Sequence, residues 1–303
     1  QRQMCIRDSI NTKRKGQLDQ ELEMTAKIIS GREVAENILQ DLKKRVDILK
    51  KKNITPKLVV VLVGDMKASA SYVAQKEKFA VKAGIDSEVL RFNSEISESE
   101  ILSQIDEIND DDKIHGVIVQ LPLPDHISVT KVLNRIDPKK DVDGFTPTNV
   151  GKLFLGEETL VSCTPKGIMS MLESTGTDLN GKNVTVIGRS NIVGKPVSIL
   201  CQQQNATVTM CHSRTKDLNA KLADADVVIV AVGVAKFING DQIPSGAIVI
   251  DVGIHNIEGK LCGDVDFETA SEKASAITPV PGGVGPMTVC ALIENTIIAA
   301  ERL

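Results

Sequence analysis

The sequence has almost no aromatic side chains: tryptophan is absent, and one tyrosine and six phenylalanines occur in 303 residues. It therefore lacks the basic stripe with interleaved aromatics that is typical of nucleic-acid-binding proteins, and its formal net charge is −4. Its longest apolar runs, such as LVVVLVG and VVIVAVGVA, are much shorter than a membrane span. We expect neither a nucleic-acid partner nor a membrane partner.

Patterns for metal ligation and disulfide bonding are also missing. The six cysteines include no C-x-x-C pair, and the four histidines are scattered, so the sequence predicts no metal site. Such cysteines are typical of reduced thiols, which favours a cytoplasmic protein. A composition of 42% hydrophobic and 25% charged residues is that of a globular protein, and the length allows two domains.

The first 23 residues stand apart because they show no apolar period. Acidic residues among their arginines argue against a mitochondrial transit peptide. We predict that residues 1–23 are disordered or a non-native extension, and that the folded chain begins near Met24.

From there, helical and strand patterns alternate to the end of the chain. Ser30 with Glu33, and Ser97 with Glu100, have the spacing of capping boxes that begin helices. The predicted strands are residues 58–64, 88–92, 116–121, 183–188, 207–212, 227–233 and 247–253. Apolar strands that alternate with helices indicate parallel sheets.

The predicted fold class is therefore α/β, with two α/β domains and a cleft between them. We expect an N-terminal domain over 24–145, completed by a C-terminal helix at 286–303. The second domain, over 146–285, is expected to contain a Rossmann-like, doubly wound parallel sheet.

The stretch NVTVIGRSNIVGKP stands where a doubly wound sheet places its phosphate loop. It departs from the G-x-G-x-x-G fingerprint, because Gly188 is followed by Ser190 and Val193 at the second and third glycine positions, and Gly194 comes one residue late. Backbone N–H groups at the start of the next helix could still face a phosphate. From the loop alone, both a nucleotide site and a plain strand-to-helix turn remain open.

The end of the following strand bears on the choice of cofactor. An NAD site usually has an acidic residue there to bind the ribose hydroxyl, but this strand ends in Cys-His-Ser-Arg, with Ser213 and Arg214 last. Arg189 lies in the loop itself. Guanidinium groups suit a phosphate, so these residues favour NADP over NAD.

A second set of polar residues lies far from this loop. Tyr72 and Lys76 are four residues apart on one face of a predicted helix, and a lysine so placed can transfer protons. Gln120 follows a buried strand, where α/β sheets present groups to ligands. For Asp143, in DVDGF, the simplest role is to cap a turn. The segment TPVPGGVGPMT (278–288) predicts a stiff loop whose backbone can approach a flat ligand closely.

Together these motifs resemble one family. YVAQK, VQLPLP, KDVDGF, CTPKG, GRSNIVGKP and PVPGGVGPMT occur in the order found in the bifunctional methylenetetrahydrofolate dehydrogenase/methenyltetrahydrofolate cyclohydrolase family. The resemblance extends from Met24 to Leu303. It implies oxidation of 5,10-methylenetetrahydrofolate with NADP, followed by hydrolysis to 10-formyltetrahydrofolate, in one-carbon metabolism. It also implies a homodimer, and because some members use NAD, that cofactor remains possible.

The resemblance also implies roles for individual residues. Lys76 would be the general acid/base, Gln120 would hydrogen-bond to it, Tyr72 would stack on the aminobenzoyl ring of the folate, and Asp143 would anchor the pterin. The remaining substrate-binding residues would be Val119, Leu121, Pro281, Gly282, Gly283, Val284 and Gly285. The cofactor-binding residues would be Gly188, Arg189, Ser190, Val193, Ser213 and Ile254.

Two other functions remain open on the same fold: a monofunctional dehydrogenase that has lost hydrolysis, and a non-catalytic NADP-binding regulator. Lys76 and Gln120 together argue against the first. A polar set of tyrosine, lysine, glutamine and aspartate far from the phosphate loop argues against the second.

Overall fold

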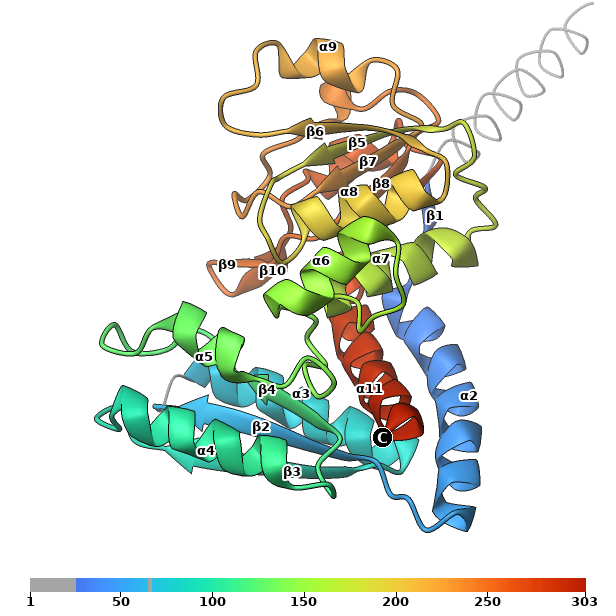
Figure 1. Cartoon of the computed structure of the whole chain (residues 1–303). Coiled ribbons are helices and arrows are strands. Elements are labelled where there is room, and N and C mark those ends of the chain that lie inside the picture. The colour runs from blue at the N-terminus through green and yellow to red at the C-terminus, as the bar shows by residue number, and fades with distance from the viewer. Residues whose placement is uncertain (1–25, 65–66) are drawn as a thin grey trace, which may run out of the picture.

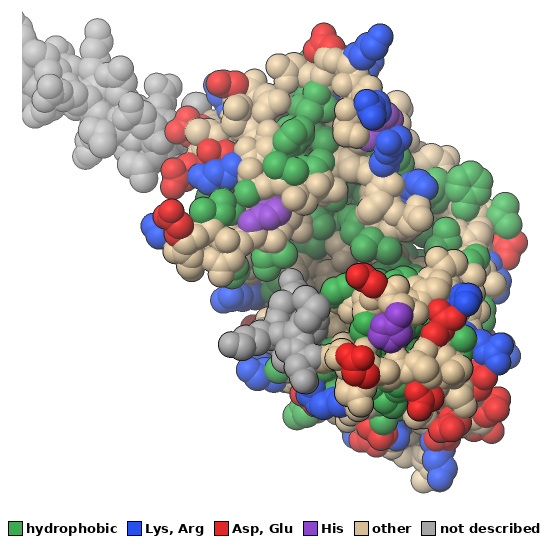
Figure 2. Space-filling view, turned by 90° about the vertical axis from the view of Figure 1, so that its left-hand side faces the viewer, with side chains coloured by type: hydrophobic (Ala, Val, Ile, Leu, Met, Phe, Trp, Pro, Cys, Tyr) green, Lys and Arg blue, Asp and Glu red, His purple; other side chains and the backbone are tan. Residues whose placement is uncertain are grey.

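The computed structural model describes residues 26–64 and 67–303, and for residues 67–72 it describes the backbone alone. The expectation of a disordered or non-native segment at 1–23 lies outside the described residues. The described chain forms two lobes joined by long helices (Figure 1), and the surface is hollowed between the lobes (Figure 2). The prediction of two α/β units with a cleft between them is confirmed.

The lobe at the bottom of Figure 1 is built on a three-stranded parallel sheet in the order β3-β2-β4. In the central strand, KLVVVLV, six of seven residues are buried. Alternate side chains from Leu58 join one core cluster, and those from Val59 join another, so both faces of the strand are covered. The elements of this lobe are α2 (Gly31–Lys51), β2 (Lys57–Val63), α3 (Lys67–Ala83), β3 (Asp86–Phe92), α4 (Glu98–Asp110), β4 (Gly116–Val119) and α5 (Val129–Arg135).

Serine side chains begin two of these helices, as the sequence predicts. The Ser97 hydroxyl accepts from Glu100 N, and the Glu100 carboxylate accepts from Ser97 N, which completes a capping box. Ser30 Oγ accepts from Glu33 N at 3.3 Å at the start of α2. Both bonds satisfy N–H groups that a helix leaves free in its first turn.

The other lobe is built on a six-stranded sheet in the order β1-β11-β8-β7-β5-β6, and all its pairs are parallel. From β5 the chain moves outward to β6 and then returns to β7 on the opposite side of β5. The point between β5 and β7 is therefore the topological switch point, where doubly wound sheets bind ligands. The elements that follow the first lobe are α6 (Pro147–Leu155), α7 (Cys163–Ser174), β5 (Asn183–Ile187), α8 (Gly194–Gln203), β6 (Thr207–Cys211), α9 (Leu218–Leu222), β7 (Val227–Val230), a short 3-10 helix (Gly240–Gln242), β8 (Ile248–Asp251), α10 (Phe267–Ser271) and β11 (Ala276–Ile277).

Two features of this lobe were not indicated by the sequence. The first described strand, β1 (Lys27–Ile28), pairs with β11, so the chain starts in the sheet of the upper lobe before it enters the lower one. An antiparallel pair, β9 (His255–Ile257) and β10 (Lys260–Cys262), projects after β8. Both are too short to show a period in the sequence.

The last helix, α11 (Val284–Arg302), packs against α2, α3 and α7 and so contacts both lobes. It is the one described helix long and apolar enough to cross a membrane by length and composition, but 67% of its apolar window is buried inside the protein. Its role is therefore that of a core helix. Asn295 and Thr296 are fully buried within it.

Several boundaries differ from the sequence prediction. Strand β4 ends at Val119 rather than at residue 121. Helix α11 begins two residues earlier than predicted, which places Pro286 at its third position. The reason is that the first four N–H groups of a helix have no partner within the helix, so a proline is tolerated there.

Candidate active site between the two sheets

Lys76 and Gln120 meet beside the carboxyl end of the lower sheet. Lys76 lies on α3, and its Nζ donates to Oε1 of Gln120 at 3.0 Å. Gln120 directly follows β4, and its Nε2 donates to the carbonyl of Leu121 at 3.0 Å. This second bond fixes which end of the amide faces the lysine, so Lys76 always meets an acceptor. Both side chains are half-buried.

Asp143 is the third member of this group. Its half-buried carboxyl lies in the turn that precedes α6. Desolvation raises the pKa of Asp143, and the nearby Lys76 ammonium opposes that shift. The structure therefore brings Lys76, Gln120 and Asp143 together from three separate segments.

Tyr72 lies on α3 one turn before Lys76, as predicted. Its side chain lies outside the described residues, so its stacking on a ligand stays a prediction.

A buried neighbour, Asp141, shapes the turn that carries Asp143. Its Oδ2 accepts from Thr146 N at 2.7 Å and from Asn149 Nδ2 at 2.9 Å, and its Oδ1 accepts from Phe145 N at 3.2 Å. These three bonds close the turn around one carboxylate. The backbone that follows Asp143 is thus fixed by hydrogen bonds within the protein.

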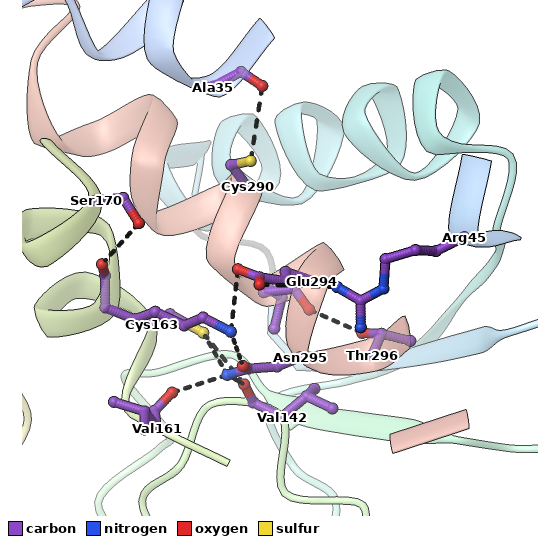
Figure 3. A network of polar contacts seen from close by, with 12 residues as sticks. Ala35, Arg45, Val142, Val161, Cys163, Ser170, Cys290, Glu294, Asn295 and Thr296 are labelled. Atoms are coloured by element: carbon purple, nitrogen blue, oxygen red, sulfur yellow. Dashed lines mark hydrogen bonds and ion pairs between the residues drawn. The ribbon is translucent and has the colours of Figure 1, made fainter. Parts of the chain in front are cut away.

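A polar network beneath the turn holds it against α11 (Figure 3). Asn295 Nδ2 donates to the carbonyls of Val142 and Val161 at 2.9 and 2.8 Å. Its Oδ1 accepts from Lys166 Nζ at 3.0 Å. Cys163 Sγ also donates to the carbonyl of Val142, at 3.1 Å. One buried amide therefore joins α11, α7 and the backbone next to Asp143.

The same network contains a shared carboxylate and a perturbed thiol. Lys166 Nζ lies 3.0 Å from Glu294, which also pairs with Arg45 on α2. Burial, and then the adjacent Asp143 carboxylate, raise the pKa of the Cys163 thiol well above its usual value. Cys163 is therefore a neutral hydrogen-bond donor at physiological pH.

The glycine-rich segment before α11 packs on the start of α2. Arg32 N donates to the carbonyl of Gly282 at 3.2 Å, and Thr164 and Thr288 hydroxyls share a 2.9 Å hydrogen bond. Of the substrate-binding residues predicted here, Pro281 and Gly285 are exposed, Gly282 is half-buried, and Gly283 and Val284 are buried.

Two of the predicted substrate-binding side chains pack in the hydrophobic core. Val119 and Val284 are each 4% exposed and belong to the buried clusters of the lower lobe and of α11. Leu121 is partly buried against the first of these clusters.

The loop after β5 is a tight turn built around one serine. Ser190 Oγ accepts from Val193 N at 3.2 Å and from Gly194 N at 3.4 Å, at the start of α8. Gly188 has φ of +133°, and a Cβ there would collide with the carbonyl of Ala231 on the neighbouring segment. In place of the glycine fingerprint, a serine satisfies backbone N–H groups, and Gly188 and Gly194 stand where backbone segments pack closely.

Exposed residues surround this loop on the edge of the upper sheet. Arg189 and Ser190 are exposed in the loop, and Ser213 and Arg214 are exposed at the end of β6. Ile254, after β8, is 51% exposed. The structure thus brings the predicted cofactor residues to the carboxyl ends of adjacent parallel strands. A close glycine contact, a helix N-terminus and two exposed guanidinium groups together fit a phosphorylated dinucleotide.

Comparison with known proteins agrees with this geometry. The catalytic-domain profile of the tetrahydrofolate dehydrogenase/cyclohydrolase family matches residues 29–143, and the profile of its NAD(P)-binding domain matches residues 162–303. Bifunctional protein FolD of Bacillus subtilis (strain 168) is 56% identical over 280 residues, which are 92% of this chain and 99% of that protein. The chain belongs to the tetrahydrofolate dehydrogenase/cyclohydrolase family.

Solved structures of the family have the same fold. The bifunctional enzyme FolD from Campylobacter jejuni is 47% identical, with a TM-score of 0.90 over 92% of this chain and 100% of that one. The Trypanosoma brucei dehydrogenase-cyclohydrolase, solved as a complex with NADP cofactor and inhibitor, is 36% identical. Its TM-score is 0.87 over 92% of this chain and 98% of that one. The family assignment made from the sequence motifs is confirmed.

Several polar residues around the site of this family member were not found from the sequence. Asn295 and Lys166 support the Asp143 turn, and the only signal for Asn295 is a polar residue within an apolar helix. Asp251 and Asp264, both buried, lie behind the loops after β7 and β8. No side-chain motif marks them, because most of their partners are backbone N–H groups.

Proposed function

We propose that this chain oxidises 5,10-methylenetetrahydrofolate to 5,10-methenyltetrahydrofolate with NADP and then hydrolyses the product to 10-formyltetrahydrofolate. The observation that carries this proposal is the contact of Lys76 with Gln120, beside the Asp143 carboxyl, in a chain whose two halves match both domains of the family. A dehydrogenase that only orients its two substrates needs no proton-transferring lysine, whereas hydrolysis does.

The cofactor-binding side of the site is the loop after β5. When bound, NADP supplies the hydride acceptor for the first reaction. Gly188 lets the loop pack closely against Ala231, and the positive end of the α8 dipole would lie toward a pyrophosphate. Arg189 and Arg214 are the guanidinium groups that would bind the additional phosphate that distinguishes NADP from NAD.

The folate-binding side is the hollow between the lobes. We assign the pterin to Asp143 and the aminobenzoyl ring to Tyr72. The exposed Pro281 and Gly285 would contact the flat part of the ligand. The interactions of the Asp143 turn are made within the protein, so the site would be preformed, and binding would cost little conformational entropy.

Lys76 performs the proton transfers of the second reaction. Loss of hydride from the methylene carbon leaves a methenyl cation, and a water oxygen adds to that carbon. Lys76 accepts a proton from the adding water, which leaves a hydroxyl on that carbon. Ring opening then breaks one carbon–nitrogen bond: the leaving nitrogen takes the proton from Lys76, and the hydroxyl loses its proton to solvent as the formyl C=O forms. Gln120 accepts a hydrogen bond from Lys76 and so aims its nitrogen during both transfers.

The division of the chain and its assembly are also part of the proposal. We assign 24–145 with the helix at 286–303 to the folate domain, and 146–285 to the NADP domain, in a cytoplasmic homodimer. The hairpin of β9 and β10 supports self-association because Ile257 and Leu261 on it are 47% and 43% exposed. Phe237, whose two neighbours hydrogen-bond to the segment after β10, is 43% exposed. Sedimentation of the purified protein would measure the mass directly.

A spectrophotometric assay tests the proposed function. The protein is mixed with 5,10-methylenetetrahydrofolate and either NADP or NAD, and formation and decay of the methenyl product are followed. We expect formation to be faster with NADP, followed by enzyme-dependent decay. Formation without catalysed decay would instead show a monofunctional dehydrogenase, and NADP binding without formation would show a non-catalytic regulator.

A further inference from the structure

Two buried carboxylates lie outside the residues used so far. Asp251 ends β8, and Asp264 follows β10; they are 3% and 0% exposed. Asp251 Oδ1 accepts from the backbone N–H groups of Gly253 and Asp264 at 3.0 and 2.8 Å, and its Oδ2 accepts from Val265 N at 3.0 Å. Asp251 therefore fixes the backbone on which Asp264 stands.

Asp264 in turn binds two loops at the carboxyl edge of the sheet. Its Oδ2 accepts from Val232 N at 2.7 Å and from Gly233 N at 2.9 Å, in the loop after β7. Its Oδ1 forms a 2.8 Å hydrogen bond with His255 Nε2, at the start of β9. One carboxylate therefore ties the loop after β7 to the segment after β8 that carries Ile254.

The Asp264 carboxyl packs tightly against the backbone of Gly253. A Cβ on Gly253 would collide with the Asp264 carboxyl. The three hydrogen-bond partners of the Asp264 carboxylate all come from its own lobe. The buried Asp264 carboxylate therefore holds the two loops together, unlike an ion pair on the surface.

These two loops lie on a defined side of the phosphate loop. Gly188 touches Ala231, the residue directly before Val232, while Ser213 and Arg214 end β6 on the opposite side of β5. A dinucleotide crosses such a sheet at the switch point, with its adenine ribose toward the second strand. The loops after β7 and β8 therefore face the nicotinamide half.

We propose that Asp264 is a positioning residue for NADP: through Val232, Gly233 and His255 it holds the two loops in the shape that receives the nicotinamide half. This inference rests on the proposed function. It predicts that Asp264 affects cofactor binding, while hydrolysis of the methenyl compound, which uses no cofactor, is spared.

The test compares Asp264→Asn with wild type and with Asp241→Asn, a control that removes an exposed carboxylate from the same lobe. We expect NADP affinity by calorimetry, and KM for NADP, to weaken at least tenfold in Asp264→Asn. Its rate of methenyltetrahydrofolate hydrolysis should stay within twofold of wild type. Asp241→Asn should match wild type in both measurements.

A second variant covers the case in which Asp264→Asn does not fold, as judged by circular dichroism. His255→Leu removes only the bond to Oδ1, and we expect about threefold weaker NADP binding with hydrolysis retained. Wild-type NADP affinity in whichever variant folds would overturn the proposal, and so would an equal loss of binding and hydrolysis. Because calorimetry needs no folate turnover, the positioning role and the proposed function can fail independently.

Discussion

Replacing Asn295 by leucine tests the buried network beneath the active-site turn. The two side chains have the same number of heavy atoms and the same branching at Cγ, so the change removes polar atoms without opening a cavity. The carbonyl of Val161 loses its 2.8 Å donor. The carbonyl of Val142 keeps Cys163 Sγ as a donor, and Lys166 keeps Glu294.

The expected cost follows from these partners. Stranding a buried polar group costs about 1–3 kcal/mol. The Val161 carbonyl is left without a donor, and the Val142 carbonyl and Lys166 each lose one of two partners. After the gain from leucine burial, the free energy of unfolding should fall by about 2–4 kcal/mol. For a chain of this size that loss lowers the Tm by about 3–6 °C. Because Val142 precedes Asp143, we also expect KM for the folate to rise several-fold.

Thr296→Val is the matched control. Thr296 is equally buried, but its hydroxyl donates only to the carbonyl of Leu292 in its own helix, at 2.9 Å. Losing that bond should cost about 1 kcal/mol or less. Calorimetric melts of both variants provide the comparison. Equal Tm losses in the two variants, or an unchanged Tm in Asn295→Leu, would refute the reasoning.

Three further predictions concern the upper lobe. Gly188→Ala places a Cβ against the carbonyl of Ala231, so we expect at least tenfold weaker NADP binding by calorimetry; wild-type affinity would contradict the close contact. Burial raises the pKa of Asp251 to about 6 from 3.8. The folded protein therefore binds a proton at Asp251 at a higher pH than the unfolded chain does. The free energy of unfolding, relative to that of Asp251→Asn, should increase by up to about 3 kcal/mol as the pH falls from 7 toward 4. This gain in stability should be lost as the pH rises through 6. A pH-independent difference in urea unfolding would exclude this. Replacing Arg189 and Arg214 together by alanine should lower kcat/KM at least tenfold with NADP but not with NAD; equal losses would remove them from phosphate recognition.

The parts of the fold that the sequence predicts best are those buried on both sides. The runs at 58–63 and 227–230 are apolar throughout because alternate residues enter two different core clusters. Strand β1 has only two residues, and its pairing with β11 is a long-range contact that no local period encodes. The predicted start of α11 at Pro286 was two residues late, since a first turn accepts proline at more than one position.

In the candidate site, too, residues marked by local patterns could be predicted, and those that depend on long-range contacts could not. Lys76 and Gln120 were each marked by a local pattern, a helix face and a strand end, and the family resemblance alone implied that they pair. Asp264 could not be found in this way. Its Oδ2 binds the backbone N–H groups of Val232 and Gly233, and nearly every residue carries such a group. A buried acid that binds backbone is visible only once the loops are in place.

The most direct test of the account is the rate of methenyltetrahydrofolate hydrolysis by Lys76→Met, with Lys78→Met as the control. Both lysines lie on α3, but Lys78 is exposed, whereas Lys76 contacts Gln120. We predict that Lys76→Met lowers hydrolysis by about 10²–10⁴-fold, the usual contribution of general acid–base catalysis, and that Lys78→Met hydrolyses at the wild-type rate. Normal hydrolysis by Lys76→Met would contradict the central claim that this lysine transfers the protons.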